Sequence, residues 1–256
     1  MAKFDIDIDY IKTGLENIGY IVKNFEEGWN NANFYKILFS NSGAIVTIFC
    51  TNKKDNSKVE GKITSDESTK LKEIVEDLKH KKNHYYYHNE INKKIVDLIN
   101  LKKEDDFFDY KSEFYKKDKD GLYRRELLHD ILCMSNNIQN RDAYLIFGVQ
   151  DDGKVIGINE DLRSNDILNF IHNINFAGDH VPQIEVLNLY YKYLKIGVII
   201  CKASKNIPFF LSKVYKGIYP NQIFTRVGDT NTPINENAKY DSIEKLWKLH
   251  FKQEEK

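Results

Sequence analysis

The chain has 256 residues, of which 41% are hydrophobic, and it carries 38 basic and 38 acidic side chains, so its formal net charge is zero. This length accommodates one large domain or two small ones, and the hydrophobic fraction is enough to build a core. The charge balance neither supports nor excludes a nucleic-acid partner, which only local clustering of charge could indicate.

Three features of the sequence bear on its location. No apolar run approaches the roughly 20 residues that span a bilayer. Residues 1–10 are acidic, whereas a signal peptide begins with basic residues. The three cysteines, Cys50, Cys133 and Cys201, are far apart in apolar segments, which is typical of buried thiols in a reducing compartment. We therefore expect a cytoplasmic protein that makes no membrane contact.

The first part of the chain predicts a helix, about four strands and a second helix, which we assign to a module of residues 1–82. The expected helices and strands lie at 8–18, 20–26, 33–40, 43–51, 57–62 and 64–82. This order resembles double-stranded RNA-binding and TBP-like modules, but Asp66 and Glu67 make the second helix acidic where those modules are basic. Three roles remain open for this module: nucleic-acid binding, dimerisation and a purely structural role. If the module dimerises, the protein would be a homodimer.

A column of histidines follows the first module. His80, His84 and His88 are spaced by four residues, which places them on one face of a helix. Zinc could use such a column, but no cysteine or nearby acid completes a site, so we favour a solvated or RNA-facing patch.

The second module, residues 83–256, predicts a mixed sheet with flanking helices, so the whole chain is expected to be α+β. Its expected helices and strands lie at 91–99, 107–112, 122–137, 142–149, 160–174, 183–191, 193–204, 206–212, 221–230 and 241–251, with a hairpin turn at Asp152-Gly153.

The strand at 107–112 holds the most distinctive residues. Side chains alternate along a strand, so Asp109 and Lys111 point to the same side. Glu104 precedes the strand and can fold over that face. Pairing of this strand with the strand at 144–149 would bring Asp109 towards Asp151. The simpler interpretation is that Asp151 belongs to a turn and that Glu104 lies in a surface link.

Four fragments in order resemble the Schlafen core, or AlbA-like, domain. They are Asp109-Tyr110-Lys111, a helix that ends in Asn136, the segment LIFGVQDDGKVIGI and the segment FTRVGDT. Each fragment alone is weak, but their order and gaps fit the family across about residues 100–250.

The resemblance implies a catalytic site. In nuclease members of that family three carboxylates hold the metal, and by position these correspond to Glu104, Asp109 and Asp151, with Lys111 beside them. Asp109 stands where the family often has glutamate, and Gln150 where it often has aspartate. Carboxylates suit Mg²⁺ or Mn²⁺, which stabilise charge on a phosphate and activate a water molecule, and Lys111 would neutralise developing charge.

The resemblance further implies a metal-dependent endoribonuclease that acts on structured RNA such as tRNA, and in bacteria a toxin or antiphage effector. The alternatives are a nucleic-acid-binding regulator without enzymatic activity and a nucleotide-binding adaptor with the same fold. A basic cluster after the strand is a candidate for contacts with the RNA backbone, although Asp118 and Asp120 dilute its charge: Lys116, Lys117, Arg124 and Arg125. Arg226 is a separate candidate for contact with an RNA phosphate.

Overall fold

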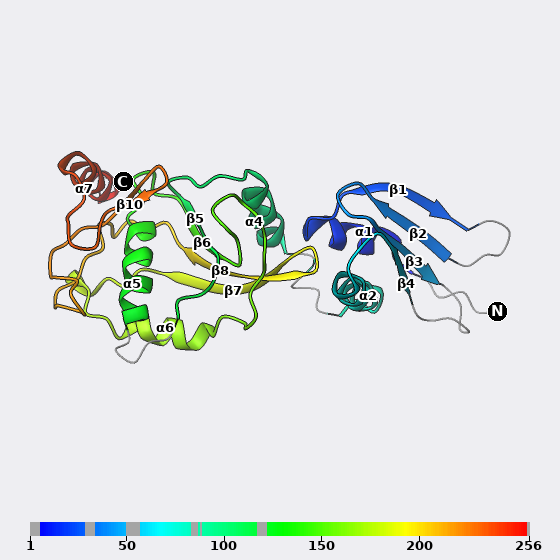
Figure 1. Cartoon of the computed structure of the whole chain (residues 1–256). Coiled ribbons are helices and arrows are strands. Elements are labelled where there is room, and N and C mark those ends of the chain that lie inside the picture. Colours follow the sequence, from blue (N-terminus) through cyan, green and yellow to red (C-terminus); the bar gives the residue numbers. More distant parts are fainter. Residues whose placement is uncertain are drawn as a thin grey trace. The chain divides into compact units, whose positions relative to one another are not determined.

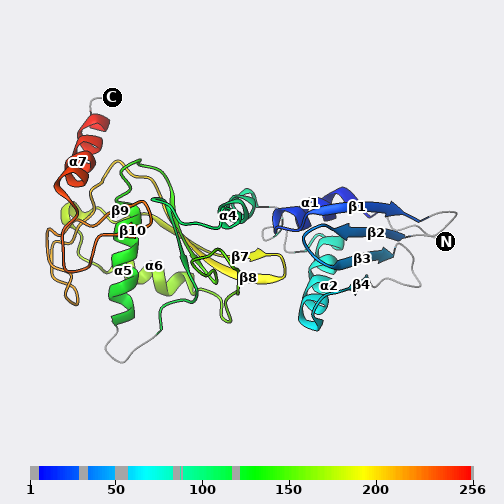
Figure 2. The same cartoon turned by 45° about the horizontal axis from the view of Figure 1, so that its top comes forward.

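The computed structural model describes residues 6–28, 34–49, 57–82, 87, 89–116 and 122–254. The chain forms two compact units. The first comprises Met1–Asn100 with Leu189–Leu194, and the second comprises Leu101–Asn188 with Lys195–Lys256. Both combine helices and strands (Figures 1 and 2), so the fold is α+β as predicted.

The first unit contains the expected order of one helix, four strands and a second helix, followed by a further helix. Its elements are α1 (Ile8–Asn17), β1 (Val22–Glu27), β2 (Phe34–Phe39), β3 (Ala44–Phe49), β4 (Lys58–Gly61), α2 (Ser65–Lys79) and α4 (Glu90–Asn100). The strands form an antiparallel sheet in the order β1-β2-β3-β4. Every second residue of β3 is buried, because the alternating side chains of that strand face the core that β2, β3, α1 and α2 share.

The first unit continues past residue 82, where we expected its boundary, and includes α4. Asn92 on this helix is fully buried. Its side-chain nitrogen donates to the backbone oxygen atoms of Asn17, at 3.0 Å, and Tyr190, at 2.9 Å. A buried amide that satisfies distant backbone groups ties its helix to them, which is why α4 belongs to this unit.

The second unit is built on a sheet with the strand order β5-β6-β8-β7. Its elements are β5 (Phe108–Lys111), α5 (Leu122–Ser135), β6 (Ala143–Phe147), α6 (Ser164–His172), η1 (Ala177–Asp179), β7 (Ile184–Tyr191), β8 (Leu194–Cys201), β9 (Arg226–Val227), β10 (Thr230–Asn231) and α7 (Tyr240–Glu254). Strand β5 runs parallel to β6, and β6 runs antiparallel to β8, so the sheet is mixed as expected. The short strands β9 and β10 form a separate antiparallel pair.

The core of this unit surrounds β6, all five residues of which are buried. An uninterrupted apolar strand is typical of the centre of a sheet that is covered on both faces. Helix α5 contributes Leu128, Ile131 and Leu132 to the same cluster. Cys133 and Cys201 are buried free thiols there, as expected, whereas Cys50 lies outside the described residues.

The prediction of a strand at 206–212 was wrong. That segment makes only one isolated bridge, between Leu211 and Phe176. The buried side chain of Asn136 takes the place of a strand partner: its oxygen accepts from the backbone nitrogen of Phe209 at 2.6 Å, and its nitrogen donates to the Phe209 carbonyl at 2.8 Å. The backbone is therefore satisfied without a sheet.

Within the part of the chain that the structure describes, no helix combines the length and the apolar character needed to cross a membrane.

Candidate active site

Strand β5 brings Asp109 and Lys111 together, as its alternation predicted. Nζ of Lys111 lies 2.8 Å from Oδ2 of Asp109. This carboxylate oxygen is buried, and the ammonium group of Lys111 is the cation that faces it.

Glu104 folds over the start of β5, also as predicted. Its Oε1 accepts a hydrogen bond from the backbone nitrogen of Tyr110 at 3.0 Å. Burial, and then the charge of the neighbouring Asp109, raise the pKa of Glu104 above its ordinary value. The charge of Asp109 thus acts directly on the Glu104 carboxyl group.

Arg226 on β9 joins these two acids. Its Nη2 lies 2.6 Å from Oε2 of Glu104 and 3.3 Å from Oδ1 of Asp109. The Arg226 side chain is only 2% exposed, so its contacts in this structure are with carboxylates inside the protein, and the predicted contact with an RNA phosphate stays a prediction. A buried guanidinium needs carboxylate partners to offset its loss of solvation, and Arg226 finds them in this cluster.

Asp130 on α5 is a member of the site that the sequence reasoning missed. Oδ2 of Asp130 lies 3.5 Å from Nζ of Lys111 and accepts a hydrogen bond from the hydroxyl of Tyr115. Asp130 is an acid that interrupts the apolar run Leu127, Leu128, Ile131 and Leu132. A charged residue on the buried face of a helix was the available signal.

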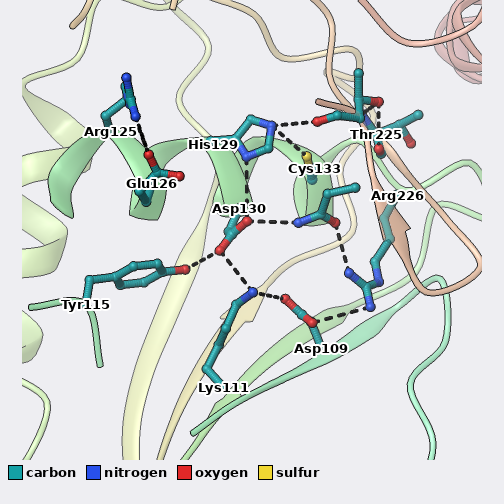
Figure 3. Close-up of polar contacts among 12 residues, drawn as sticks. Asp109, Lys111, Tyr115, Arg125, Glu126, His129, Asp130, Cys133, Thr225 and Arg226 are labelled. Atoms are coloured by element: carbon teal, nitrogen blue, oxygen red, sulfur yellow. Dashed lines mark hydrogen bonds and ion pairs between the residues drawn. The ribbon is translucent and has the colours of Figure 1, made fainter. Parts of the chain in front are cut away.

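The contacts close into a ring through Asn231 on β10. Nη1 of Arg226 donates to Oδ1 of Asn231 at 3.0 Å, and Nδ2 of Asn231 donates to Oδ1 of Asp130 at 2.8 Å. We call this set the charge ring; Figure 3 shows its charged members together with Tyr115. Its members are Asp109, Lys111, Asp130, Asn231 and Arg226.

Lys111 is the most exposed charged member of the ring. Its side chain is 31% exposed, whereas those of Asp109, Asp130 and Arg226 are between 2% and 10% exposed. Burial disfavours the charged ammonium group, but Asp130 and Asp109 outweigh this effect and raise the pKa of Lys111. Lys111 is therefore a cation at neutral pH, and of the ring's charged groups it is the one most accessible to an incoming ligand.

Two groups beside the ring superficially resemble a nucleophilic site. Nε2 of His129 lies 3.6 Å from Sγ of Cys133. However, Cys133 is fully buried, and burial raises the pKa of its thiol well above the usual value. A nucleophilic cysteine needs an accessible thiolate, so Cys133 is structural.

Asp151 is not brought to the other two predicted carboxylates. Strands β5 and β6 pair as expected, but the register places Asp109 opposite Leu145, and the chain leaves the strand at Gly148, where φ is +90°. Asp151 is exposed in the following turn. Among the described residues no group of three or more His, Cys, Asp or Glu side chains could hold a metal ion.

The predicted basic cluster divides into separate contacts. Lys116 is exposed and pairs with Glu113 at 2.7 Å, and Arg125 pairs with Glu126 at 2.6 Å. The guanidinium of Arg124 lies 5.5 Å from the centre of the Phe170 ring. Lys117 lies outside the described residues.

The family model described as Schlafen, AlbA_2 matches residues 104–235, which is more than half of the chain. The chain belongs to the Schlafen, AlbA_2 family. The matched segment begins at Glu104 and includes every member of the charge ring. No curated protein matches the chain.

Two solved structures are similar to this Schlafen, AlbA_2 chain. One is the DIP2311 protein from Corynebacterium diphtheriae, with 19% identity and a TM-score of 0.35 over 54% of this chain and 29% of that one. The other is the N-terminal domain of an ATP-dependent DNA helicase RecG-related protein from Nitrosomonas europaea, with 12% identity and a TM-score of 0.33 over 57% and 94%. This chain thus spans less than a third of the Corynebacterium protein. At this level of similarity neither structure bears on the activity.

The acids of this family member fit a hard cation only as a pair. Glu104 and Asp109 both contact Nη2 of Arg226, and Oδ2 of Asp109 is buried against the ammonium group of Lys111. Mg²⁺ is commonly held by one or two carboxylates with water completing its coordination shell, so the pair suits it. The three-carboxylate set implied by the family is incomplete because Asp151 lies apart.

The histidine column is only partly described. His80 lies 3.7 Å from Glu76, while His84 and His88 lie outside the described residues.

Proposed function

We propose that this Schlafen, AlbA_2 protein is a metal-dependent endoribonuclease that cleaves structured RNA such as tRNA. The observation that carries the proposal is the arrangement of Glu104 and Asp109 beside the accessible ammonium group of Lys111. Membership of the family supports a role with nucleic acid, and a toxin or antiphage role is the biological setting that we propose with it.

The carboxylates of Glu104 and Asp109 would hold Mg²⁺ or Mn²⁺. When bound, the cation would supply a coordinated water of lowered pKa and positive charge for the phosphate oxygens. Burial and then the charge of Asp109 raise the pKa of Glu104, and a bound cation would offset the second of these effects.

Lys111 would bind the scissile phosphate. Its ammonium group is held in place by the carboxylates of Asp109 and Asp130. As the reaction proceeds, the phosphate becomes pentacoordinate and gains negative charge. A fixed cation stabilises that charge most when it needs no reorganisation. Because the pKa of Lys111 is raised, its side chain would stay positively charged and would stabilise the phosphate electrostatically. It would not accept a proton.

Arg226, Asn231 and Asp130 would position these groups. Arg226 holds both Glu104 and Asp109, and Asn231 links Arg226 to Asp130. None of the three needs to touch RNA, because each acts by fixing the orientation of a neighbouring side chain.

A nucleic-acid-binding regulator without catalytic activity is the second candidate. It is favoured by the position of Asp151 outside the acid pair, and by the neutralisation of that pair by Arg226 and Lys111. Such a protein would bind RNA and leave it intact.

Incubation of the purified chain with tRNA separates the two candidates. Cleavage that requires Mg²⁺ or Mn²⁺, stops with EDTA and is lost in Lys111→Met supports the endoribonuclease. Binding without cleavage under every metal condition supports the regulator. Cleavage that persists in Lys111→Met identifies a contaminating nuclease or another site, and counts against the proposed one.

A further inference from the structure

A pocket of about 910 Å³ lies next to the charge ring. Its walls come from residues 112–116 after β5, the first turns of α5, residues 156–163 and helix α6. Its volume is in the range of sites that enclose a small molecule or one nucleotide. No part of the proposed cleavage chemistry uses it.

Part of the pocket lining is aromatic. Phe114, Tyr115 and Phe170 line it, and Arg124 lies over the ring of Phe170 at 5.5 Å. Aromatic rings and guanidinium planes are the surfaces on which bases removed from a stacked strand settle. The wall therefore favours a flat aromatic ligand.

The rest of the lining carries both charges: the basic residues Lys116, Arg124 and Arg163, and four carboxylates. Of its four carboxylates, Glu113 pairs with Lys116, and Asp161 pairs with Lys195. The other two, Glu160 and Asp166, have no ion-pair partner among the described residues. A free carboxylate repels a phosphate but accepts a hydrogen bond from an exocyclic amino group, as in recognition of cytosine N4. Glu160 and Asp166 therefore provide acceptors for the amino group of a base.

The pocket is coupled to the ring through one residue. Tyr115 lines the pocket, and its hydroxyl donates to Oδ2 of Asp130, one of the two carboxylates that contact Lys111. Ser112, the neighbour of Lys111 in the chain, also lines the pocket. A nucleotide whose phosphate contacts Lys111 thus has a pocket beside it for its base.

We propose that this pocket binds one unpaired, amino-bearing base (adenine, cytosine or guanine) of the RNA strand next to the phosphate at Lys111. The inference rests on the proposed function and narrows its substrate class to RNA with a bulged, looped or flipped nucleotide at the site. A free nucleotide would offer the same ring chemistry, and the test includes it as a separate arm.

Binding measured in EDTA tests the proposal without depending on cleavage. The full chain is titrated into three labelled RNA hairpins, which carry a single adenosine bulge, an abasic bulge at the same position, or no bulge. We expect the adenosine bulge to bind about tenfold more tightly than the abasic one, as stacking of one base provides. Adenosine monophosphate is the fourth probe, added as a competitor.

Two adjacent arginines provide the matched variants. Arg124→Gln removes a guanidinium that lines the pocket, whereas Arg125→Gln alters the next residue, which pairs with Glu126 outside it. We expect Arg124→Gln to abolish the preference for the base and Arg125→Gln to retain it. Phe114→Leu, which keeps an apolar side chain at the wall, provides a second pocket variant whose melting temperature is checked first.

Two results would overturn the proposal: equal affinity for the adenosine and abasic bulges, or a base preference that survives in both Arg124→Gln and Phe114→Leu. Competition by adenosine monophosphate that depends on Arg124, without any base preference in RNA, would assign the pocket to a free nucleotide instead. A base preference in a protein that cleaves no RNA would support the pocket and reject the nuclease.

Discussion

Arg226 donates from Nη2 to Oε2 of Glu104 across 2.6 Å, although the two residues are 122 positions apart in the sequence. The same nitrogen lies 3.3 Å from Oδ1 of Asp109. One buried guanidinium thus links the segment before β5 to β5 itself and to the β9–β10 pair, and it holds two acids at a separation that their charges alone would oppose.

Removal of Arg226 tests whether this contact supports the fold. Arg226→Met leaves Glu104 and Asp109 buried without their shared cation, and we expect the free energy of unfolding to fall by about 3–5 kcal/mol. Arg125→Gln, which disrupts a more exposed pair with Glu126, should cost no more than about 1 kcal/mol. Urea unfolding of both variants at neutral pH measures these changes. An equal decrease in the free energy of unfolding would show that the buried contacts of Arg226 stabilise the fold no more than the exposed pair does.

The raised pKa of Glu104 predicts a pH dependence of stability. A carboxyl group with a raised pKa binds its proton more tightly in the folded state. Its stabilising contribution is therefore present below the ordinary pKa of glutamate and is lost as the pH rises through the folded-state pKa. Glu104→Gln cannot titrate, so the melting temperature of the wild type minus that of this variant should decline as the pH rises from acid towards neutral.

The sign of that trend shows which effect on the Glu104 carboxyl group is larger: burial with the charge of Asp109, or the pairing with Arg226. An increase of the difference with pH would mean that the pairing with Arg226 outweighs burial and the charge of Asp109. The wild type and the variant are compared in the absence of divalent cations, because a bound cation would itself lower the pKa of Glu104.

Mn²⁺ binding should stabilise the folded chain. A ligand that binds only the folded state raises its stability with concentration, so we expect the melting temperature to rise as Mn²⁺ is added. Asp109→Asn removes one carboxylate of the pair and should abolish most of this rise. Asp142→Asn alters a carboxylate that pairs with Lys202 away from the charge ring and should leave the rise intact; a loss in both variants would indicate nonspecific binding.

Asp151 and Asp152 form a controlled pair for the third carboxylate implied by the family. Asp152 has a local role, since its Oδ1 accepts from the backbone nitrogen of Lys154 at 2.9 Å, and asparagine can make the same turn contact. Because Asp151 lies apart from Glu104 and Asp109, Asp151→Asn should reduce cleavage far less than Asp109→Asn. Equal losses in cleavage assays would show that Asp151 joins the acids when metal or RNA binds.

Much of the site could be predicted from local patterns. The alternation of FFDYKS is enough to place Asp109 and Lys111 on one face, and the spacing of Glu104 placed it near them. The alternation within strands and the spacing of apolar residues in helices also predicted most of the elements of both units.

What the patterns could not supply were contacts between segments distant in the chain. Arg226 looked exposed because it stands on a short strand, and its burial depends on acids more than 100 residues away. Asp130 needs Lys111 and Asn231 as partners, which no local pattern identifies. The separation of Asp151 from Asp109 depends on the register of the parallel strands β5 and β6. That register places Leu145, and not Asp151, opposite Asp109.

The most direct test of the nuclease site is the rate of tRNA cleavage in Mn²⁺ by the wild type, Asp109→Asn and Asp152→Asn, measured with enzyme in excess. The substitution at Asp109 keeps the side-chain volume but removes a charge from the acid pair, and we predict a loss of at least about 100-fold, as for removal of a group that stabilises a transition state. Asp152→Asn should cleave at the wild-type rate. Cleavage by Asp109→Asn at the wild-type rate would contradict the assignment of Glu104, Asp109 and Lys111 as the catalytic centre.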